Sequence, residues 1–240
     1  MKNTVLPQIA NPAQIEKTVF VVTYGRTGST LIQNLLNAID GYCIRGENEN
    51  AVAPLALAWN TLKQSSNVRN IGKKAVATTP IHPWYGAELI NPNRFGRAMA
   101  NAFIRTVLAP PTGTRVTGFK EIRWAHDPKF LPTLLNYVHM AFPNPHFVFN
   151  TRSLDEVAES AWWANMKPEA VTARLTRTEA AFADYLAAYP QRGVHIHYND
   201  YVADQEALAP MYEFIGETYV PDQVAEIMSQ RLTHLQKGDR

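Results

Sequence analysis

A buried strand that leads through a glycine-containing turn directly into a helix is the feature that most limits how this chain can fold. Residues 18–23 read TVFVVT, which is β-branched or apolar throughout and indicates a strand covered on both faces. The turn TYGRTGST follows, and Leu and Ile residues then recur at helical spacing until Gly41. A unit of this kind belongs in a parallel sheet with helices on both sides.

The same alternation continues along the chain. Further strands are expected at residues 116–119, 146–150 and 194–198. Helical patterns follow them, at residues 127–142, 154–165, 168–189, 205–215 and 222–235. The sequence therefore predicts an α/β fold, with one domain over residues 1–240 and a mainly parallel central sheet flanked by helices. Residues 1–17 are an N-terminal extension, and residues 48–112 form an insert of unclear order.

Composition excludes several classes of protein. The 240 residues carry 23 Lys and Arg against 21 Asp and Glu, and the basic residues are scattered, which argues against a nucleic-acid partner. The longest apolar run, residues 51–59, is much shorter than a transmembrane segment. The start of the chain lacks the apolar core of a secretory signal, and the single cysteine, Cys43, cannot form an intrachain disulfide. We therefore expect a cytoplasmic protein.

The turn between residues 23 and 30 is a candidate anion site. Two glycines between a strand and a helix aim backbone N–H groups at an anion, and phosphate or sulfate is the obvious guest. The segment is not a Walker A loop, because Gly28 is followed by Ser29 rather than by lysine, and the only cation is Arg26. The alternative interpretation is a tight turn without a ligand.

A second segment, HFVFNTRSLDEVAES, places Arg152 just after a buried strand and Ser160 eight residues later. Eight residues are about two helical turns, so the guanidinium and the hydroxyl could hold one terminal phosphate between them. The alternative is an ordinary surface arginine and an ordinary helix serine.

Together these two segments resemble the cofactor signature of sulfotransferases that use 3′-phosphoadenosine 5′-phosphosulfate (PAPS). The resemblance implies a P-loop-like sulfotransferase fold and a 3′-phosphate site at Arg152 and Ser160. It also implies that the 5′-phosphosulfate is bound by the first segment, through Arg26, Thr27, Gly28, Ser29 and Thr30. The later segment HYNDYVADQEALAPMYEFIG is similar to a strand-helix segment of the same enzymes and places Tyr198 near the nucleotide.

Two further stretches resemble the branch that contains tyrosylprotein and carbohydrate sulfotransferases. YCIRGENENAV implies a catalytic glutamate at Glu47, and GFKEIRW implies a catalytic lysine at Lys120. In-line sulfuryl transfer needs cations where negative charge builds up and a base opposite them, by analogy with phosphoryl transfer. Arg26 and Lys120 are the expected cations, Glu47 is the expected base, and no metal is required because the departing group is already a stabilised phosphate.

Alternatives remain open for both catalytic residues. Other branches of the family use a histidine base, for which His82 and His126 are the candidates. Glu47 could be a solvated loop carboxylate beside Arg45, and Lys120 could be an ordinary partner of Glu121 or Asp127.

Several other residues are weaker candidates. His195 and His197 share one face of a strand, but no further ligands accompany them, so a structural role is expected. Trp84 and Tyr85 could stack on a sugar, although core or lid positions are equally consistent with them. Lys237, in the terminal LQKGDR, could contact the 3′-phosphate, but the match is short.

We therefore expect a PAPS-dependent sulfotransferase that acts on a hydroxyl of a carbohydrate or glycolipid, with residues 48–112 on the acceptor side. A peptide tyrosine or a small alcohol or phenol is the alternative acceptor. A P-loop-type kinase and a non-catalytic nucleotide-binding protein are the alternative functions. The kinase would need a Walker lysine and a carboxylate for magnesium, and neither is visible in the sequence.

Overall fold

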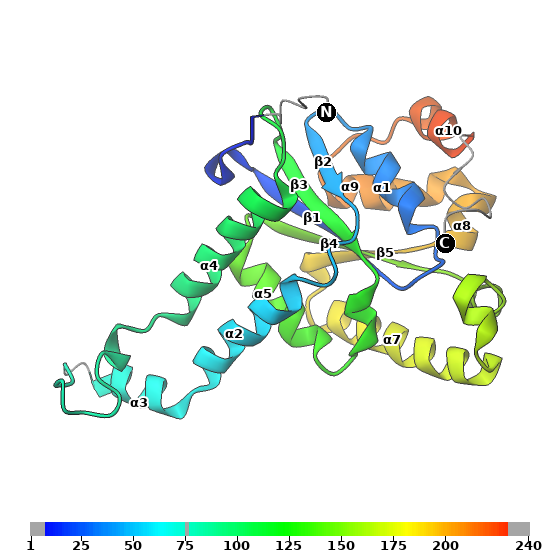
Figure 1. Ribbon diagram of the computed structural model, residues 1–240. Coiled ribbons are helices and arrows are strands. Elements are labelled where there is room, and N and C mark those ends of the chain that lie inside the picture. Colours follow the sequence, from blue (N-terminus) through cyan, green and yellow to red (C-terminus); the bar gives the residue numbers. More distant parts are fainter. Residues whose placement is uncertain (1–7, 75–76, 230–240) are drawn as a thin grey trace, which may run out of the picture.

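Five parallel strands form the central sheet of the computed structural model, which describes residues 8–74 and 77–229 (Figure 1). The strands are β1 (Lys17–Thr23), β2 (Tyr42–Arg45), β3 (Val116–Glu121), β4 (Pro145–Thr151) and β5 (Gly193–His197). Their order in the sheet is β2-β3-β1-β4-β5. The expected single-domain α/β fold with a parallel sheet is confirmed.

Strand β1 lies at the centre of the sheet, where the direction of the chain connections reverses. The chain passes from β1 to the edge strand β2, returns to β3, and then crosses to β4 and β5 on the other side. In the sheet Val21 pairs with Lys120 of β3 and with Val148 of β4. Open α/β sheets bind their ligands outside the carboxyl ends of the strands at such a reversal, and here the turn after Thr23 lies there.

Helices cover both faces of the sheet (Figure 1). One face carries α2 (Val52–Gln64), α4 (Pro92–Phe103), α5 (Leu131–Ala141) and α7 (Pro168–Ala188). The other carries α1 (Ser29–Asn37), α8 (Tyr198–Ala203), α9 (Ala209–Phe214) and α10 (Pro221–Ser229). Side chains of β1 alternate between these two cores, with Phe20 in the first and Val19 and Val21 in the second. This explains why every position of β1 after Lys17 is apolar or β-branched.

Residues 52–108 form a helical arm that projects from the body of the domain (Figure 1). Helix α2 leads outward, α3 (Ser66–Lys74) and a short 3-10 turn η2 (Ala87–Leu89) lie at the tip, and α4 returns. The base of the arm packs on α5, where the ring of Trp59 lies 5.7 Å from that of Tyr137. The arm then ends in a π-helical turn, η3 (Ile104–Leu108). The sequence had left this order undecided.

Several elements differ from the expected ones. Strand β2 was not expected. The expected helix 154–165 is broken into α6 (Leu154–Ala158) and a 3-10 turn, η5 (Ala161–Asn165), with Ser160 extended between them. Helix α5 begins only at Leu131, because the Asp127 carboxylate caps the turn before it.

Further short turns interrupt the expected pattern. Residues 205–215 divide into a 3-10 turn, η7 (Gln205–Leu208), and α9. The other 3-10 turns are η1 (Pro12–Gln14), η4 (Arg123–His126) and η6 (Pro190–Arg192). The N-terminal extension is packed where it is described, because Ala10 and Ile15 are buried.

Candidate active site

The turn between β1 and α1 has the backbone of an anion-binding loop. Gly28 is the N-cap of α1 and adopts φ +74°, in the left-handed region that favours glycine. A Cβ atom on Gly28 would come within 2.3 Å of the Tyr198 ring, so the aromatic ring covers the loop closely. In the described part of the chain, the backbone N–H groups of Gly28, Ser29 and Thr30 donate no hydrogen bond. These free donors stand at the positive end of the helix dipole.

Arg26 links this loop to the second predicted segment. Its Nε donates to Ser160 Oγ at 3.0 Å, and its carbonyl accepts a hydrogen bond from the Arg152 guanidinium at 3.1 Å. The extended backbone at Ser160 places the hydroxyl within reach of Arg26. The structure therefore brings Arg26, Arg152 and Ser160 together, although the predicted continuous helix between the last two is absent from the described residues.

Besides the carbonyl of Arg26, the Arg152 guanidinium contacts Tyr198 and Glu156. It stacks over the Tyr198 ring, with its central carbon 4.4 Å from the ring centroid, and it donates to Glu156 from both Nε and a terminal nitrogen. Hydrogen bonding from Arg152 lowers the pKa of the Glu156 carboxyl, and a hydrogen bond from Asn199 acts in the same direction. Glu156 is thus an anionic partner of the arginine that was predicted to bind a phosphate.

Buried polar side chains fix the shape of the loop through hydrogen bonds. Asn150 donates to the carbonyl of Thr27 at 2.9 Å, and Tyr201 donates to the Asn150 side chain at 3.2 Å. The Thr23 and Thr27 hydroxyls lie 2.6 Å apart, and all four of these residues are buried. Because buried polar groups without partners are costly, this network specifies one loop conformation.

A second cluster lies beside the loop, at the carboxyl end of β3. Lys120 Nζ is 2.6 Å from one oxygen of Glu47, and the Arg123 guanidinium is 2.8 Å from the other. Lys120 pairs with neither Glu121 nor Asp127, the two partners that the sequence offered as alternatives. Strand β3 is hydrogen-bonded to β1, and Lys120 pairs with Val21 in their register. The cluster and the loop therefore both lie at the carboxyl ends of the strands.

Glu121 positions the segment that carries Glu47. It is fully buried, and its carboxylate accepts hydrogen bonds from the backbone N–H groups of Asn48, Asn50 and Arg123. Arg123 also contacts this carboxylate at 3.5 Å. Sequence reasoning missed Glu121 and Arg123 as site residues. Their signal was present in GFKEIRW, where three charged residues stand at or just after the end of a buried strand.

Comparison with known proteins identifies the family and supports the fold. A model described as the sulfotransferase family matches residues 18–222. The chain belongs to this family. The sulfotransferase domain of the Synechococcus PCC 7002 olefin synthase superposes with a TM-score of 0.57 at 17% identity, covering 92% of this chain and 80% of that domain.

A sulfotransferase from Alicyclobacillus acidocaldarius superposes with a TM-score of 0.49 at 14% identity, covering 89% of this chain and 85% of the other. No curated protein matches in sequence. The expected family and fold are confirmed.

The remaining candidates lie in different places on this sulfotransferase. His126 is in η4, directly after the Lys120 cluster; burial and then the charges of Arg174 and Arg123 lower its pKa. His82 precedes η2, in the turn at the tip of the arm, and so does not lie at the carboxyl ends of the strands. Lys237 lies outside the described residues.

Within the described residues, His195, His197 and the aromatic pair Trp84 and Tyr85 form no hydrogen bond with the loop. His195 and His197 both hydrogen-bond the Thr151 hydroxyl at 2.8 Å, which fits a structural role. Trp84 and Tyr85 are exposed on the arm. The described residues contain no cluster of His, Cys, Asp and Glu suited to a metal ion.

Proposed function

We propose that this sulfotransferase moves a sulfuryl group from PAPS to a hydroxyl of a carbohydrate or glycolipid, with Glu47 as the general base. The observation that carries the proposal is the position of the Lys120–Glu47–Arg123 cluster, which lies at the carboxyl ends of the strands together with the Arg26 loop. This position supports the proposal, because a carboxylate and two cations lie at the same ends of the strands as the turn to which we assign the anion.

The residues at the loop fit an anionic nucleotide. Free backbone N–H groups follow Arg26, and two further groups, Arg152 and Ser160, contact that arginine directly. We assign the 5′-phosphosulfate to Arg26 with Thr27, Gly28, Ser29 and Thr30, the 3′-phosphate to Arg152 and Ser160, and a nucleotide contact to Tyr198. When bound, PAPS supplies a sulfuryl group on a mixed anhydride whose departing phosphate is a stable anion.

The second cluster supplies the acid-base and charge-stabilising groups. Lys120 and Arg123 each hold one oxygen of Glu47, so an incoming anion competes with this carboxylate for the same donors. Once those donors turn to the reacting oxygens, Glu47 is free to accept the proton of the attacking hydroxyl. A positioned base of this kind typically contributes about 10² to 10⁴ in rate, and preorganised cations stabilise the charge that develops.

The segment after Glu47 favours a hydroxyl-rich acceptor. The side-chain nitrogen of Asn48 and the side-chain oxygen of Asn50 are buried without a hydrogen-bond partner in the described part of the chain. Buried polar groups normally have partners. A sugar ring offers both donors and acceptors, so we assign these two amides to the acceptor.

The experiment combines nucleotide titration with sulfate transfer. Calorimetric titration should show tight binding of adenosine 3′,5′-bisphosphate and weak binding of magnesium-ATP, and labelled PAPS should transfer sulfate to a sugar or glycolipid. Tyrosine peptides, phenols and simple alcohols complete the acceptor panel. Preference for magnesium-ATP would indicate a kinase. Tight binding of the bisphosphate without transfer to any acceptor would indicate a non-catalytic binding protein.

A further inference from the structure

The arm is strongly basic, although the net charge of the whole chain is small. Residues 52–108 contain seven Lys and Arg residues and one carboxylate, Glu88, whereas the whole chain has a formal net charge of only +2. The rest of the chain is therefore net acidic. The seven basic residues are Lys63, Arg69, Lys73, Lys74, Arg94, Arg97 and Arg105.

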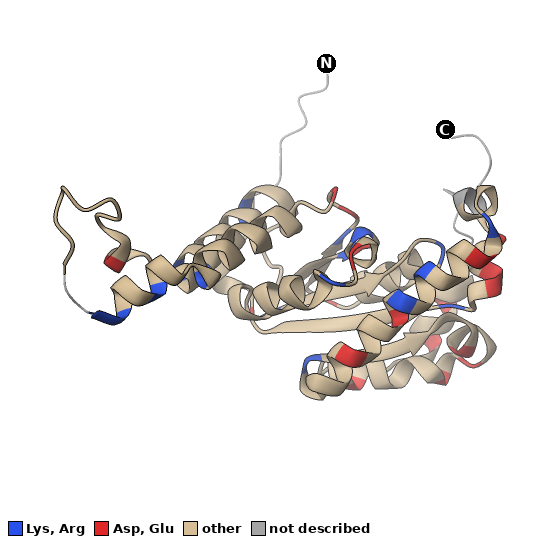
Figure 2. Ribbon diagram, turned by 90° about the horizontal axis from the view of Figure 1, so that it is seen from below, with Lys and Arg blue, Asp and Glu red and all other residues tan. Residues whose placement is uncertain are grey.

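These basic side chains face solvent. All seven are exposed, and within the described residues none forms an ion pair. In Figure 2 the carboxylates in view lie on the body of the domain, apart from one near the tip of the arm. A separation of charge of this size gives the arm an attraction for anionic partners.

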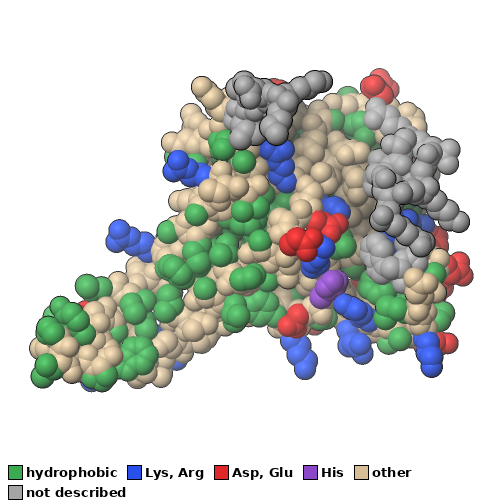
Figure 3. All heavy atoms as spheres, viewed as in Figure 1, with side chains coloured by type: hydrophobic (Ala, Val, Ile, Leu, Met, Phe, Trp, Pro, Cys, Tyr) green, Lys and Arg blue, Asp and Glu red, His purple; other side chains and the backbone are tan. Residues whose placement is uncertain are grey.

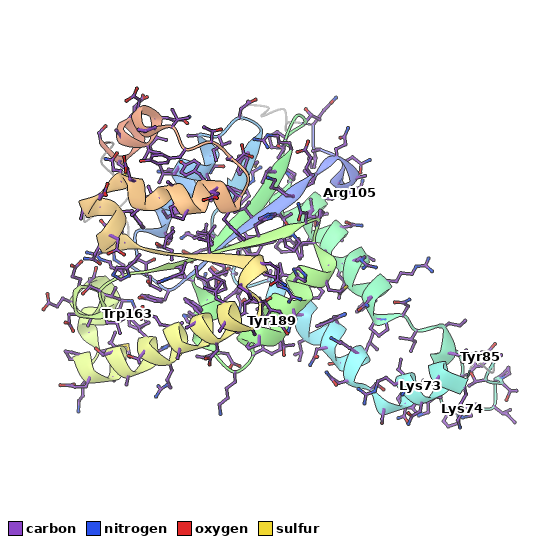
Figure 4. All side chains as sticks on the ribbon, turned by 180° about the vertical axis from the view of Figure 1, so that it is seen from behind. Lys73, Lys74, Tyr85, Arg105, Trp163 and Tyr189 are labelled. Atoms are coloured by element: carbon purple, nitrogen blue, oxygen red, sulfur yellow. The ribbon has the colours of Figure 1, made fainter. Side chains whose placement is uncertain are left out.

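Large apolar side chains are exposed at the same tip. Ile81 is 95% exposed, Leu89 81% and Tyr85 61%, while Trp84 and Ile90 are exposed to a smaller degree. All five lie within ten residues of sequence, in the turn around η2. Figure 3 shows hydrophobic side chains gathered over the tip, and Figure 4 shows Tyr85 there together with Lys73 and Lys74.

This combination of chemistry and shape fits a lipid surface. Trp and Tyr favour the interface between headgroups and acyl chains, aliphatic side chains enter its apolar side, and lysines attract anionic headgroups. A projecting turn fits a fluid surface, which needs no complementary hollow. A second copy of the chain would bring an equally basic tip against this one.

We infer that the arm docks the enzyme on an anionic lipid bilayer through the η2 turn and the neighbouring α3 lysines. The contact is peripheral, and no helix among the described residues is long and apolar enough to span a membrane. Because α2 begins five residues after Glu47, docking at the tip ties the site region to the membrane surface. The inference stands on the arm alone and does not depend on the proposed function.

Vesicle binding of the full chain tests the inference. Vesicles of phosphatidylcholine with phosphatidylserine should sediment the protein at low salt, vesicles of phosphatidylcholine alone should bind it at least tenfold more weakly, and added salt should weaken binding. Brominated acyl chains should quench the fluorescence of the wild type, and Trp84→Phe should lose most of this quenching.

Two pairs of substitutions locate the contact. Lys73→Gln with Lys74→Gln should weaken binding to the anionic vesicles by about 10- to 30-fold, since each basic residue near such a surface contributes about 1 kcal/mol. Ile81→Ser with Leu89→Ser should weaken it at least tenfold. Matched controls on the body, Lys129→Gln with Lys167→Gln and Val202→Ser with Val220→Ser, should bind like the wild type.

Other outcomes overturn the inference. It fails if the arm variants bind like the wild type, if both vesicle types bind equally, or if neither binds. It also fails if the protein does not bind vesicles and light scattering shows a dimer that the arm substitutions dissociate. The tip is then a contact between two copies of the chain. Thermal unfolding of each variant, which should match the wild type, confirms that the substitutions leave the fold intact.

Discussion

At the scale of single residues, the site holds two charged groups that already have partners. Glu47 lies between Lys120 and Arg123, and Arg152 is paired with Glu156 at 2.6 Å. The proposed function requires an incoming anion to replace a carboxylate in each case. Under this proposal, binding and catalysis both depend on competition for the same cations.

Glu47→Gln tests the proposed base. The amide keeps the size of the carboxylate and some of its hydrogen bonds but cannot accept the proton, so turnover should fall by about 10² to 10⁴. Affinity for adenosine 3′,5′-bisphosphate should hardly change. Single-turnover transfer of labelled sulfate measures the first effect and calorimetry the second.

Glu49→Gln is the matched control, because Glu49 also pairs with Arg123 but is 86% exposed. It should retain turnover. Full activity of Glu47→Gln together with loss of activity in His126→Ala would transfer the role of base to the histidine.

Arg152→Ala tests the 3′-phosphate site. Wild-type protein should bind adenosine 3′,5′-bisphosphate more tightly than AMP by about 10- to 150-fold, because a hydrogen bond to a charged group contributes about 1.5–3 kcal/mol. The variant should lose most of this preference. Glu156→Gln, which removes the competing carboxylate, should tighten binding of the bisphosphate. Equal affinities of the wild type for the two nucleotides would remove the basis of the assignment.

At the scale of elements, the site depends on how the β1–α1 loop is enclosed by segments far away in sequence. Tyr198, at the start of α8, covers Gly28, and the indole of Trp163 in η5 donates to the carbonyl of Gly25 at 3.3 Å. The loop shape is therefore set jointly by β1, α8 and η5.

Gly28→Ala tests this enclosure. The new Cβ meets the Tyr198 ring and requires a left-handed backbone that costs an L-residue about 1–2 kcal/mol. Stability to urea and affinity for the bisphosphate should both fall. Gly86→Ala at φ +83°, where a Cβ meets nothing within 4 Å, measures the backbone cost alone and should leave nucleotide binding intact. If the two variants lose the same stability, the ring does not restrict the loop.

At the scale of the whole molecule, a charged cluster at the amino ends of the strands connects the segment after α9 to the sheet. Glu217 accepts two hydrogen bonds from Arg115 at 2.9 Å and one from Tyr42, and Lys17 lies 3.8 Å away. Three of these four residues stand at or just before the start of β1, β2 or β3. The cluster thus links the amino ends of three strands, whereas the candidate site lies at their carboxyl ends.

Glu217→Gln should lower the free energy of unfolding at pH 7 by about 1.5–3 kcal/mol, the usual contribution of hydrogen bonds to a charged group. The hydrogen bonds from Arg115 lower the pKa of Glu217, although burial opposes the effect. Its stabilisation is therefore present above the ordinary glutamate value and is lost as the pH falls below about 4.3.

Urea unfolding at pH 7 and pH 3.5 should accordingly show a smaller difference between wild type and variant at the lower pH. Glu213→Gln, at an exposed position in α9, is the control and should not alter stability. A difference that stays constant with pH would mean that the charge of Glu217 contributes nothing.

Local patterns in the sequence were sufficient for the fold class and the family. The apolar strand before Gly28 shows its burial on both faces within six residues, and Arg152 and Ser160 follow another such strand. These signals are local because a strand, its turn and the next helix are consecutive in the chain.

Tertiary contacts decided everything that depends on residues far apart in sequence. Strand β2 is only four residues long and exists because it pairs with β3, more than 70 residues later. The helix predicted over residues 154–165 is broken where Ser160 bonds to Arg26, and the buried Glu121 holds the loop of Glu47 through backbone N–H groups. Among the described residues, the arm packs on the body of the domain at its base, mainly against α5, and its outer part projects. Periodicity reports which face of a segment is apolar, whereas the identity of the surface that covers that face is fixed only when the chain is folded.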